Sequence, residues 1–217
     1  MHSFSRRLRT ILPAHARKVF SKLSSPQKIQ DFLDALPINF EETGETNLSP
    51  LLVLREKKAH CFEGAVFAAA ALAYHGERPL LMDFETLPND EDHTITVFKQ
   101  KGHWGAISKT NHAVLKYRDP VYESPRELAM SFFNEYYLWD GTKSMRSYSK
   151  PFDLSQFAPE QWVTSDEPLD WLMTTLSKSG YYTVVPRGTK LRKASKIELE
   201  ALKLTEWYDH GRNSFKV

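Results

Sequence analysis

Cysteine is nearly absent from the sequence, which also shows no excess of charge of one sign. One cysteine occurs among 217 residues, which excludes an intramolecular disulfide and any cysteine-rich zinc or iron–sulfur site. A single thiol is typical of a reducing compartment, so we expect a cytoplasmic protein. The 29 lysines and arginines barely exceed the 27 acidic residues, a balance that predicts no specific nucleic-acid partner. No apolar run approaches the ~20 residues that a helix needs to cross a bilayer, so we expect no membrane span.

The sequence also lacks the local motifs of several common catalytic chemistries. It has no glycine-rich phosphate loop, no Gly-x-Ser-x-Gly turn and no His-Glu-x-x-His metal pair. The eight histidines are not spaced as a metal-binding cluster with the cysteine. We therefore expect no metal and no organic cofactor, and cysteine chemistry is what remains.

Both ends of the chain are basic and differ from its middle. No acidic residue precedes Asp31. The cations before it are Arg6, Arg7, Arg9, Arg17, Lys18, Lys22 and Lys28. Apolar residues of the same segment have helical spacing, which favours an amphipathic helix over a targeting segment or a contact with an anionic surface. We predict a basic helical extension over residues 1–24, one domain over residues 25–186, and a basic, helical extension over residues 187–217.

The most distinctive segment is an alanine-rich run that begins at Cys61. After Glu63 it has almost no polar face, and Gly76 supplies a left-handed stop. A helix that is apolar all round belongs in the middle of a domain. Hydrophobic residues make up 41% of the chain, which suffices for a core around this helix. Cys61 then lies at the amino-terminal end of a buried central helix. We expect Glu63 to cap this helix or to pair with Lys57 or Lys58.

Short strand-like runs follow the central helix. Residues 79–84, 94–98 and 104–108 have the composition of strands, with a tight turn between the second and third. Flanking helices are predicted over residues 25–37 and 124–137. Further elements are predicted at residues 147–152 and 181–185 (strands) and at residues 168–178 and 197–207 (helices). The expected fold class is α+β, in which the buried central helix with its amino-terminal cysteine packs on an antiparallel sheet.

The hairpin between the second and third runs places a polar side chain beside His93. If residues 100–101 form the turn, His93 faces Ser108 on the neighbouring strand. If the turn lies one residue later, His93 faces Thr110, with Asn111 next along the chain. Either register gives the imidazole a polar neighbour.

A thiol at a helix amino terminus differs chemically from one in a core. The unpaired backbone N–H groups and the helix dipole favour the thiolate of Cys61, and the same N–H groups can hold a developing oxyanion. Nucleophilic catalysis also needs a base within hydrogen-bond reach and a third polar group that orients the base. We predict His93 as the base, oriented by Ser108 or Asn111.

Other histidines, and a structural thiol, are the alternatives. His112 with Asp119 is a rival base–acid pair. His103 lies in or beside the turn, and His60 is expected to point to another side of the chain than Cys61. A lone cysteine in an alanine-rich helix can also serve as a small buried hydrophobe.

Over roughly residues 49–111 the chain resembles the transglutaminase-like superfamily. The matching features are the Cys-Phe-Glu-Gly-Ala run, the helix end at His75-Gly76, the strand start at Asp92-His93, and Trp104 four residues before Ser108. Papain-like cysteine proteases and arylamine N-acetyltransferases use the same Cys–His–Asp/Asn arrangement. The family usually carries Asp where Ser108 falls, and serine can hydrogen-bond an imidazole but cannot stabilise imidazolium by charge. Asn111 is of the residue type that papain-like enzymes use.

The resemblance implies cysteine-dependent acyl chemistry on an amide or thioester, with Cys61 as nucleophile and His93 as base. The acceptor is water in a peptidase or amidase and an amine in a transferase, and the sequence does not choose between them. The partner implied is a peptide or amide-bearing substrate. The alternative is a catalytically inactive transglutaminase-like module that binds or scaffolds, its third catalytic member lost.

Overall fold

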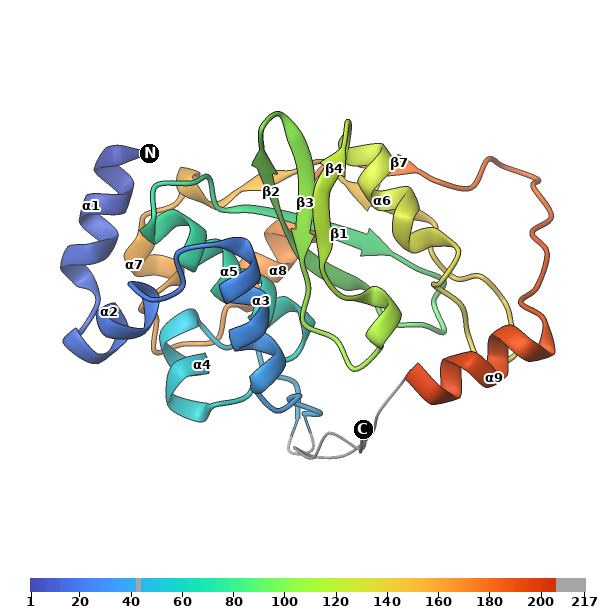
Figure 1. The fold of residues 1–217 in the computed structure, drawn as a ribbon, viewed down its shortest axis with the longest axis horizontal. Coiled ribbons are helices and arrows are strands. Elements are labelled where there is room, and N and C mark those ends of the chain that lie inside the picture. Colours follow the sequence, from blue (N-terminus) through green and yellow to red (C-terminus); the bar gives the residue numbers. More distant parts are fainter. Residues whose placement is uncertain (42–43, 206–217) are drawn as a thin grey trace.

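The fold is an antiparallel sheet with helices on both faces, seen in a computed structural model that describes residues 1–41 and 44–205 (Figure 1). The strands are β1 (Leu80–Glu85), β2 (His93–Gln100), β3 (His103–Ile107), β4 (Arg118–Tyr122), β5 (Ser147–Ser149), β6 (Phe152–Asp153) and β7 (Tyr181–Thr183). The α-helices are α1 (His2–Ile11), α2 (Ala14–Phe20), α3 (Pro26–Ala35), α4 (Pro50–Glu56), α5 (Cys61–Tyr74), α6 (Pro125–Phe133), α7 (Pro159–Trp162), α8 (Asp170–Ser177) and α9 (Lys196–Thr205). Short 3-10 turns are η1 (Ala113–Leu115) and η2 (Leu154–Gln156).

The sheet separates two apolar layers. Its order in the described residues is β4-β3-β2-β1-β5-β7, with β6 also pairing with β1. Side chains alternate along β2, so Ile95 and Val97 pack with α6 on one face while Phe98 packs with α5 on the other. Thr96 also faces α5, where its hydroxyl donates to the carbonyl of Ala65.

Helix α5 lies at the centre of the larger layer, as the alanine-rich run predicts. Every residue after Cys61 in this helix is buried, and helices α1, α3 and α4 cover the sides that the sheet leaves open. Small side chains allow this close approach, since a Cβ on Gly64 would come within 2.4 Å of the Lys109 side chain. The expected α+β class, with a buried central helix on an antiparallel sheet, is confirmed.

Serine–proline pairs start three of the helices for a local reason. Proline at the first helical position has no N–H to leave unpaired, and the serine before it caps a free N–H. The capping hydroxyls of Ser25, Ser49 and Ser124 accept from the backbone N–H groups of Lys28, Leu52 and Glu127. The expected strand and helix positions are met within a few residues, except that α6 ends at Phe133 rather than near residue 137.

The β2–β3 hairpin adopts the later of the two expected registers. Gln100 pairs with His103 and Thr96 with Ile107, so Lys101 and Gly102 form the turn, with φ of 48° and 87°. Both values lie in the left-handed region that a two-residue hairpin turn requires, and glycine adopts it without strain.

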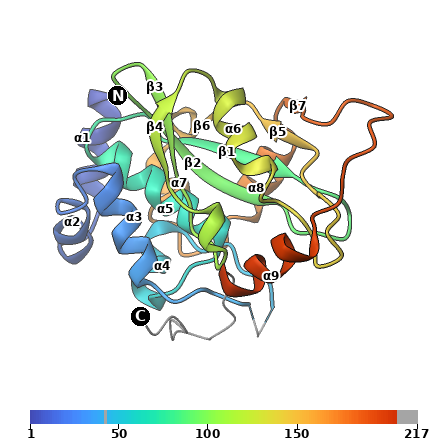
Figure 2. The same cartoon turned by 45° about the vertical axis from the view of Figure 1, so that its right-hand side comes forward.

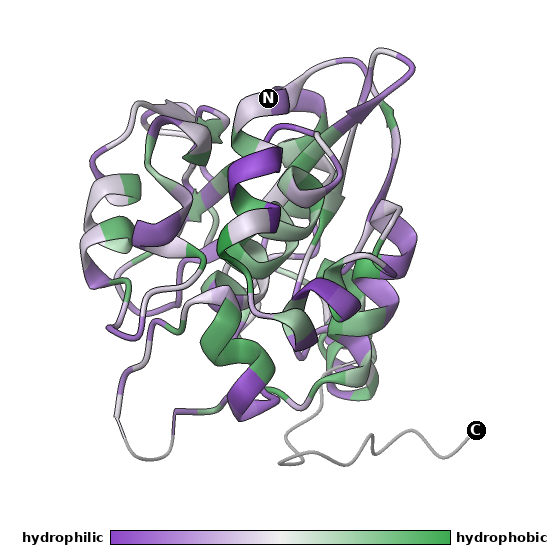
Figure 3. Ribbon diagram, turned by 90° about the vertical axis from the view of Figure 1, so that its left-hand side faces the viewer, coloured by the Kyte–Doolittle hydropathy of each residue, from purple (hydrophilic) through white to green (hydrophobic). Residues whose placement is uncertain are grey.

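The first helices belong to the same core as the sheet. Leu8, Leu12 and Phe20 are almost completely buried against α5, and the side chains of Ser5 and Arg9 donate to the carbonyl of Tyr74 at the carboxyl end of α5. In Figure 3, which looks onto the side where the chain begins, α1 lies in front and carries strongly hydrophilic residues on its outside. Residues 1–24 therefore form a basic amphipathic layer over the central helix.

Helix α9 lies on the side of the molecule opposite α1 (Figures 1 and 2). Helix α9 is attached through Tyr137, whose hydroxyl donates to the Glu198 carbonyl at 2.8 Å. The expected helix over residues 197–207 matches α9 up to residue 205, and residues 206 and 207 lie outside the described residues. Of the helices that the structure describes, none has the length and apolarity needed to cross a membrane.

Candidate active site

Cys61 is the first residue of helix α5, and the residue is partly buried. The helix begins here because His60, in an extended conformation with φ −92° and ψ −171°, acts as the N-cap residue. The carboxylate of Glu63 returns to accept from the His60 backbone N–H at 2.9 Å, which satisfies one of the donors that a helix start leaves open. The backbone around Cys61 is thereby fixed, at a helix start where the first-turn N–H groups have no partner within the helix.

His93 opens strand β2 and is 5% exposed. Its ring lies between Phe84 and Tyr136, with ring centroids 6.4 Å from each. The Nε2 atom is 2.8 Å from the hydroxyl oxygen of Ser108. Because Nε2 is engaged there, Nδ1 is the nitrogen that remains to exchange a proton with Cys61.

Ser108 reaches His93 although the hairpin register does not pair the two residues. That register, continued, would bring Thr110 opposite His93, but the ladder stops at Ile107. Beyond this point the Gln30 side chain of helix α3 provides the hydrogen bonds of the Ser108 backbone. Gln30 Oε1 accepts from the Ser108 N–H at 3.0 Å, and Gln30 Nε2 donates to the Ser108 carbonyl at 2.9 Å. With its backbone held in this way, Ser108 places its hydroxyl oxygen 2.8 Å from the imidazole Nε2.

The sulfur lies among two imidazoles and a backbone carbonyl. Its distance to the Asp92 carbonyl oxygen is 4.0 Å. Burial raises the pKa of Cys61, but hydrogen bonds with His60 and His93 and the positive charges of these rings outweigh burial and bring the pKa to about 5. Cys61 is thus poised to be a thiolate at neutral pH.

His60 is placed differently from its sequence-based expectation. Adjacent side chains point apart along an extended strand. The chain instead changes from extended to helical between the two residues, so both side chains interact with each other.

Asn111, the second candidate to orient the base, lies in a bend after Thr110. The neighbouring Thr110 hydroxyl accepts from the His112 backbone N–H at 3.0 Å. The structure brings Ser108 to the Nε2 atom of His93.

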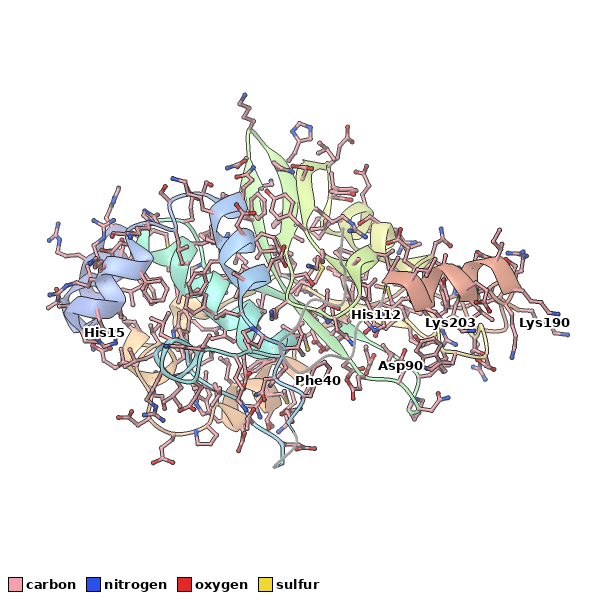
Figure 4. All side chains as sticks on the ribbon, turned by 60° about the horizontal axis from the view of Figure 1, so that its bottom comes forward. His15, Phe40, Asp90, His112, Lys190 and Lys203 are labelled. Atoms are coloured by element: carbon pink, nitrogen blue, oxygen red, sulfur yellow. The ribbon has the colours of Figure 1, made fainter. Side chains whose placement is uncertain are left out.

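The rival base His112 is buried beside the site. Burial, then the nearby charge of His93, lowers the pKa of His112 to about 4, and the charge of Asp90 partly offsets this lowering. Both His112 and Asp90 are labelled in Figure 4. Asp119 is an exposed residue of edge strand β4, where Pro120 is tolerated because an edge strand has an unpaired side.

Two other candidates have structural positions away from the sulfur. His103 is exposed beside the hairpin turn, with Nδ1 3.2 Å from the Lys101 carbonyl oxygen. Trp104 packs in the layer under α6, and the Lys99 ammonium lies 5.0 Å from the centre of its ring. Glu63 caps α5, as expected in the first of its two predicted roles.

A further acid near the site carried no recognisable sequence signal. Asp83 of β1 accepts hydrogen bonds from the hydroxyls of Thr94 at 2.7 Å and Tyr181 at 2.8 Å. Burial raises the pKa of Asp83, partly against these bonds, and the charge of Cys61 adds to the rise. Among residues 1–41 and 44–205, no three His, Cys, Asp or Glu side chains gather in a way that could hold a metal ion.

Comparison with known proteins gives a distant likeness of structure. No protein-family model matches the sequence, and no curated protein matches it. Among solved structures the chain is similar to Legionella pneumophila LapG (EGTA-treated), with 10% sequence identity and a TM-score of 0.37, over 81% of this chain and 96% of that chain. At this level of similarity, the chemistry of the site follows from its own residues.

Proposed function

We propose that this chain is a cysteine-dependent enzyme that transfers or hydrolyses acyl groups of amides or thioesters. The observation that carries the proposal is the alignment of three groups: the Cys61 sulfur at a helix amino terminus, the His93 ring beside it, and the Ser108 hydroxyl 2.8 Å from Nε2 of that ring. Nucleophile, base and orienting group in this order are what nucleophilic catalysis requires. The order of Cys61 and His93 along the chain also resembles the transglutaminase-like superfamily.

In the first half of the reaction, the thiolate of Cys61, whose proton His93 has already taken, attacks the carbonyl carbon of a peptide or other amide-bearing substrate. The tetrahedral oxyanion is held by the backbone N–H groups at the start of α5. His93 then gives its proton to the leaving amine or thiol as the carbon–nitrogen or carbon–sulfur bond breaks, which leaves a thioester on Cys61. Water or an amine attacks that thioester in the second half, with His93 again as base.

A second candidate function follows from the residue at the third position. Ser108 orients His93 but supplies no negative charge, whereas the resembled family usually carries Asp there. A transglutaminase-like module that binds a partner without catalysis would keep the fold and tolerate serine. The two functions differ in whether Cys61 becomes acylated.

The test is the reaction of the purified chain with p-nitrophenyl acetate, followed by intact-protein mass spectrometry. We expect one acetyl group on the wild-type chain, none on Cys61→Ser, and unchanged labelling of His103→Ala, an exposed histidine away from the sulfur. Hydroxylamine should remove the label, since it cleaves a thioester. If the folded wild-type chain takes up no acetyl group while the unfolded chain does, the proposal of catalysis fails and the binding module is the better account.

A further inference from the structure

Glu63 is a carboxylate with no exposed surface in the first turn of helix α5. Oε1 accepts from the Thr46 hydroxyl at 2.8 Å and from the Leu48 backbone N–H at 3.0 Å. Oε2 accepts from the His60 backbone N–H at 2.9 Å and from the Asn39 amide at 3.2 Å. A buried charge is expensive unless it is fully hydrogen-bonded and paired, so this number of donors marks Glu63 as a carboxylate that the fold is built to keep.

The cation that faces this carboxylate is the ring of His60. Its Nε2 lies 3.4 Å from Glu63 Oε1 and 3.7 Å from Glu41 Oε1. Nε2 also lies 2.7 Å from the Thr46 carbonyl oxygen. A carbonyl can only accept, so Nε2 carries a hydrogen, and Nδ1 is the nitrogen left to interact with Cys61.

The charges around the ring favour a persistent imidazolium. Burial lowers the pKa of His60, but the interactions with Cys61, Glu63 and the Thr46 carbonyl outweigh burial and raise it to about 9. From β2, His93 also faces the sulfur. Other charged groups nearby are Glu41 beside His60, Asp83 on β1, Asp92 before β2, and His112 beside His93.

We propose that His60 is a second cationic positioning residue for Cys61, which together with the buried carboxylate of Glu63 holds the sulfur as a thiolate independently of His93. This inference rests on the proposed nucleophilic role of Cys61. His60 is tied to Thr46 and Glu63 and keeps its charge, whereas His93, beside a neutral hydroxyl, moves the proton during the reaction. The carboxylate–imidazole pair that Ser108 cannot form with His93 is therefore present on the helix side of the sulfur, as Glu63 and His60.

The experiment measures the rate of alkylation by iodoacetamide against pH. Cys61 is the only cysteine, so each alkylation event reports this one sulfur. The variants are His60→Gln, which keeps a donor for the Thr46 carbonyl, His93→Ala, and the two combined. His75→Gln is the matched control, because His75 lies at the other end of α5 and its Nε2 contacts a backbone carbonyl, that of Phe20, at 2.9 Å.

We expect His60→Gln to raise the midpoint of the alkylation profile from about 5 by about 1–2 pH units, which lowers the rate at pH 6 by about two- to tenfold. His93→Ala alone should keep a midpoint below the ~8.5 of an ordinary thiol, and the double variant should reach or exceed that value. His75→Gln should leave the profile unchanged. The proposal is overturned if His60→Gln has the midpoint of its parent in both backgrounds, or if His93→Ala alone reaches ~8.5.

A measurement on the unaltered chain covers the case in which His60→Gln does not fold. Alkylation of Cys61 removes the sulfur charge without a substitution. The histidines are titrated by 15N NMR before and after this alkylation. Two imidazoles should then titrate at lower pH than before, and a shift of only one would refute a second cationic partner. Neither measurement needs a substrate, so a failure of this inference is seen in the alkylation profile and the titration, and a failure of the proposed function is seen in the acetylation test.

Discussion

Gln30→Leu should disturb the position of Ser108 in the site, although the two residues are 78 positions apart in the sequence. The Gln30 side chain forms both backbone hydrogen bonds of Ser108, at 3.0 Å and 2.9 Å, and Ser108 has no exposed surface. Leucine fills a similar volume but leaves a buried N–H and a buried carbonyl unpaired. Each stranded group costs about 1–3 kcal/mol, so we expect a loss of about 2–6 kcal/mol in the free energy of unfolding.

Urea denaturation measures that loss, and the alkylation profile of Cys61 measures its effect on the site. Gln27→Leu is the matched control, since Gln27 lies one turn earlier on the same helix and is exposed. If Ser108 is held mainly by Gln30, Gln30→Leu should also raise the pH at which Cys61 alkylates, because His93 loses its oriented partner. A Gln30→Leu chain whose stability and alkylation profile both match those of Gln27→Leu would refute this account of how Ser108 is positioned.

Three further predictions concern the core, a buried cation and the third site residue. Deleting residues 1–24 should abolish cooperative thermal melting, because each lost large core side chain costs about 2–5 kcal/mol. A sharp melt of the truncated chain would contradict this. Burial lowers the pKa of Lys109 to about 8, so the folded state binds fewer protons than the unfolded state between pH 8 and 10.5. Over that window the stability of the wild type should rise by on the order of 3 kcal/mol relative to Lys109→Met, and parallel curves would refute the shift. Ser108→Asp should lower the alkylation midpoint of Cys61 by adding a charge beside His93, and an unchanged or higher midpoint would show that position 108 does not act on the imidazole.

The fold was predictable where local signals and burial agree. Serine–proline pairs mark helix starts, and the alanine-rich run that lacks a polar face could only be a central helix. The hairpin register was left open between two turns, although Gly102 as the second turn residue is the pattern that a two-residue turn favours. Strand β4 was missed because Pro120 is typical of a turn, and only its edge position makes it compatible with a sheet.

The site was predictable only in the parts that neighbours in sequence define. Cys61 at a helix start and His93 at a strand start follow from local patterns, whereas the contact of Gln30 with Ser108 joins segments with no shared signal. The orientation of His60 was also not predictable, although His60 is the sequence neighbour of Cys61. The sequence places it next to Cys61, but the direction of its ring depends on where the extended chain becomes a helix, which the carboxylate of Glu63 determines by capping the His60 N–H.

Lys109 illustrates how the core and the site depend on each other. It follows Ser108 directly, and its ammonium donates to the carbonyls of Leu33, at 2.7 Å, and Leu36 at the carboxyl end of α3. A cation at this end of a helix interacts favourably with the helix dipole. Its side chain reaches that end by passing over Gly64 of α5, where a Cβ would come within 2.4 Å. Helix α3 thus holds this segment twice, through the Gln30 side chain on the backbone of Ser108 and through its own carbonyls on the Lys109 side chain. Serine orients His93 by a hydrogen bond and not by charge, so its backbone must be held rigidly. A hydroxyl that moved away would leave His93 without an orienting partner.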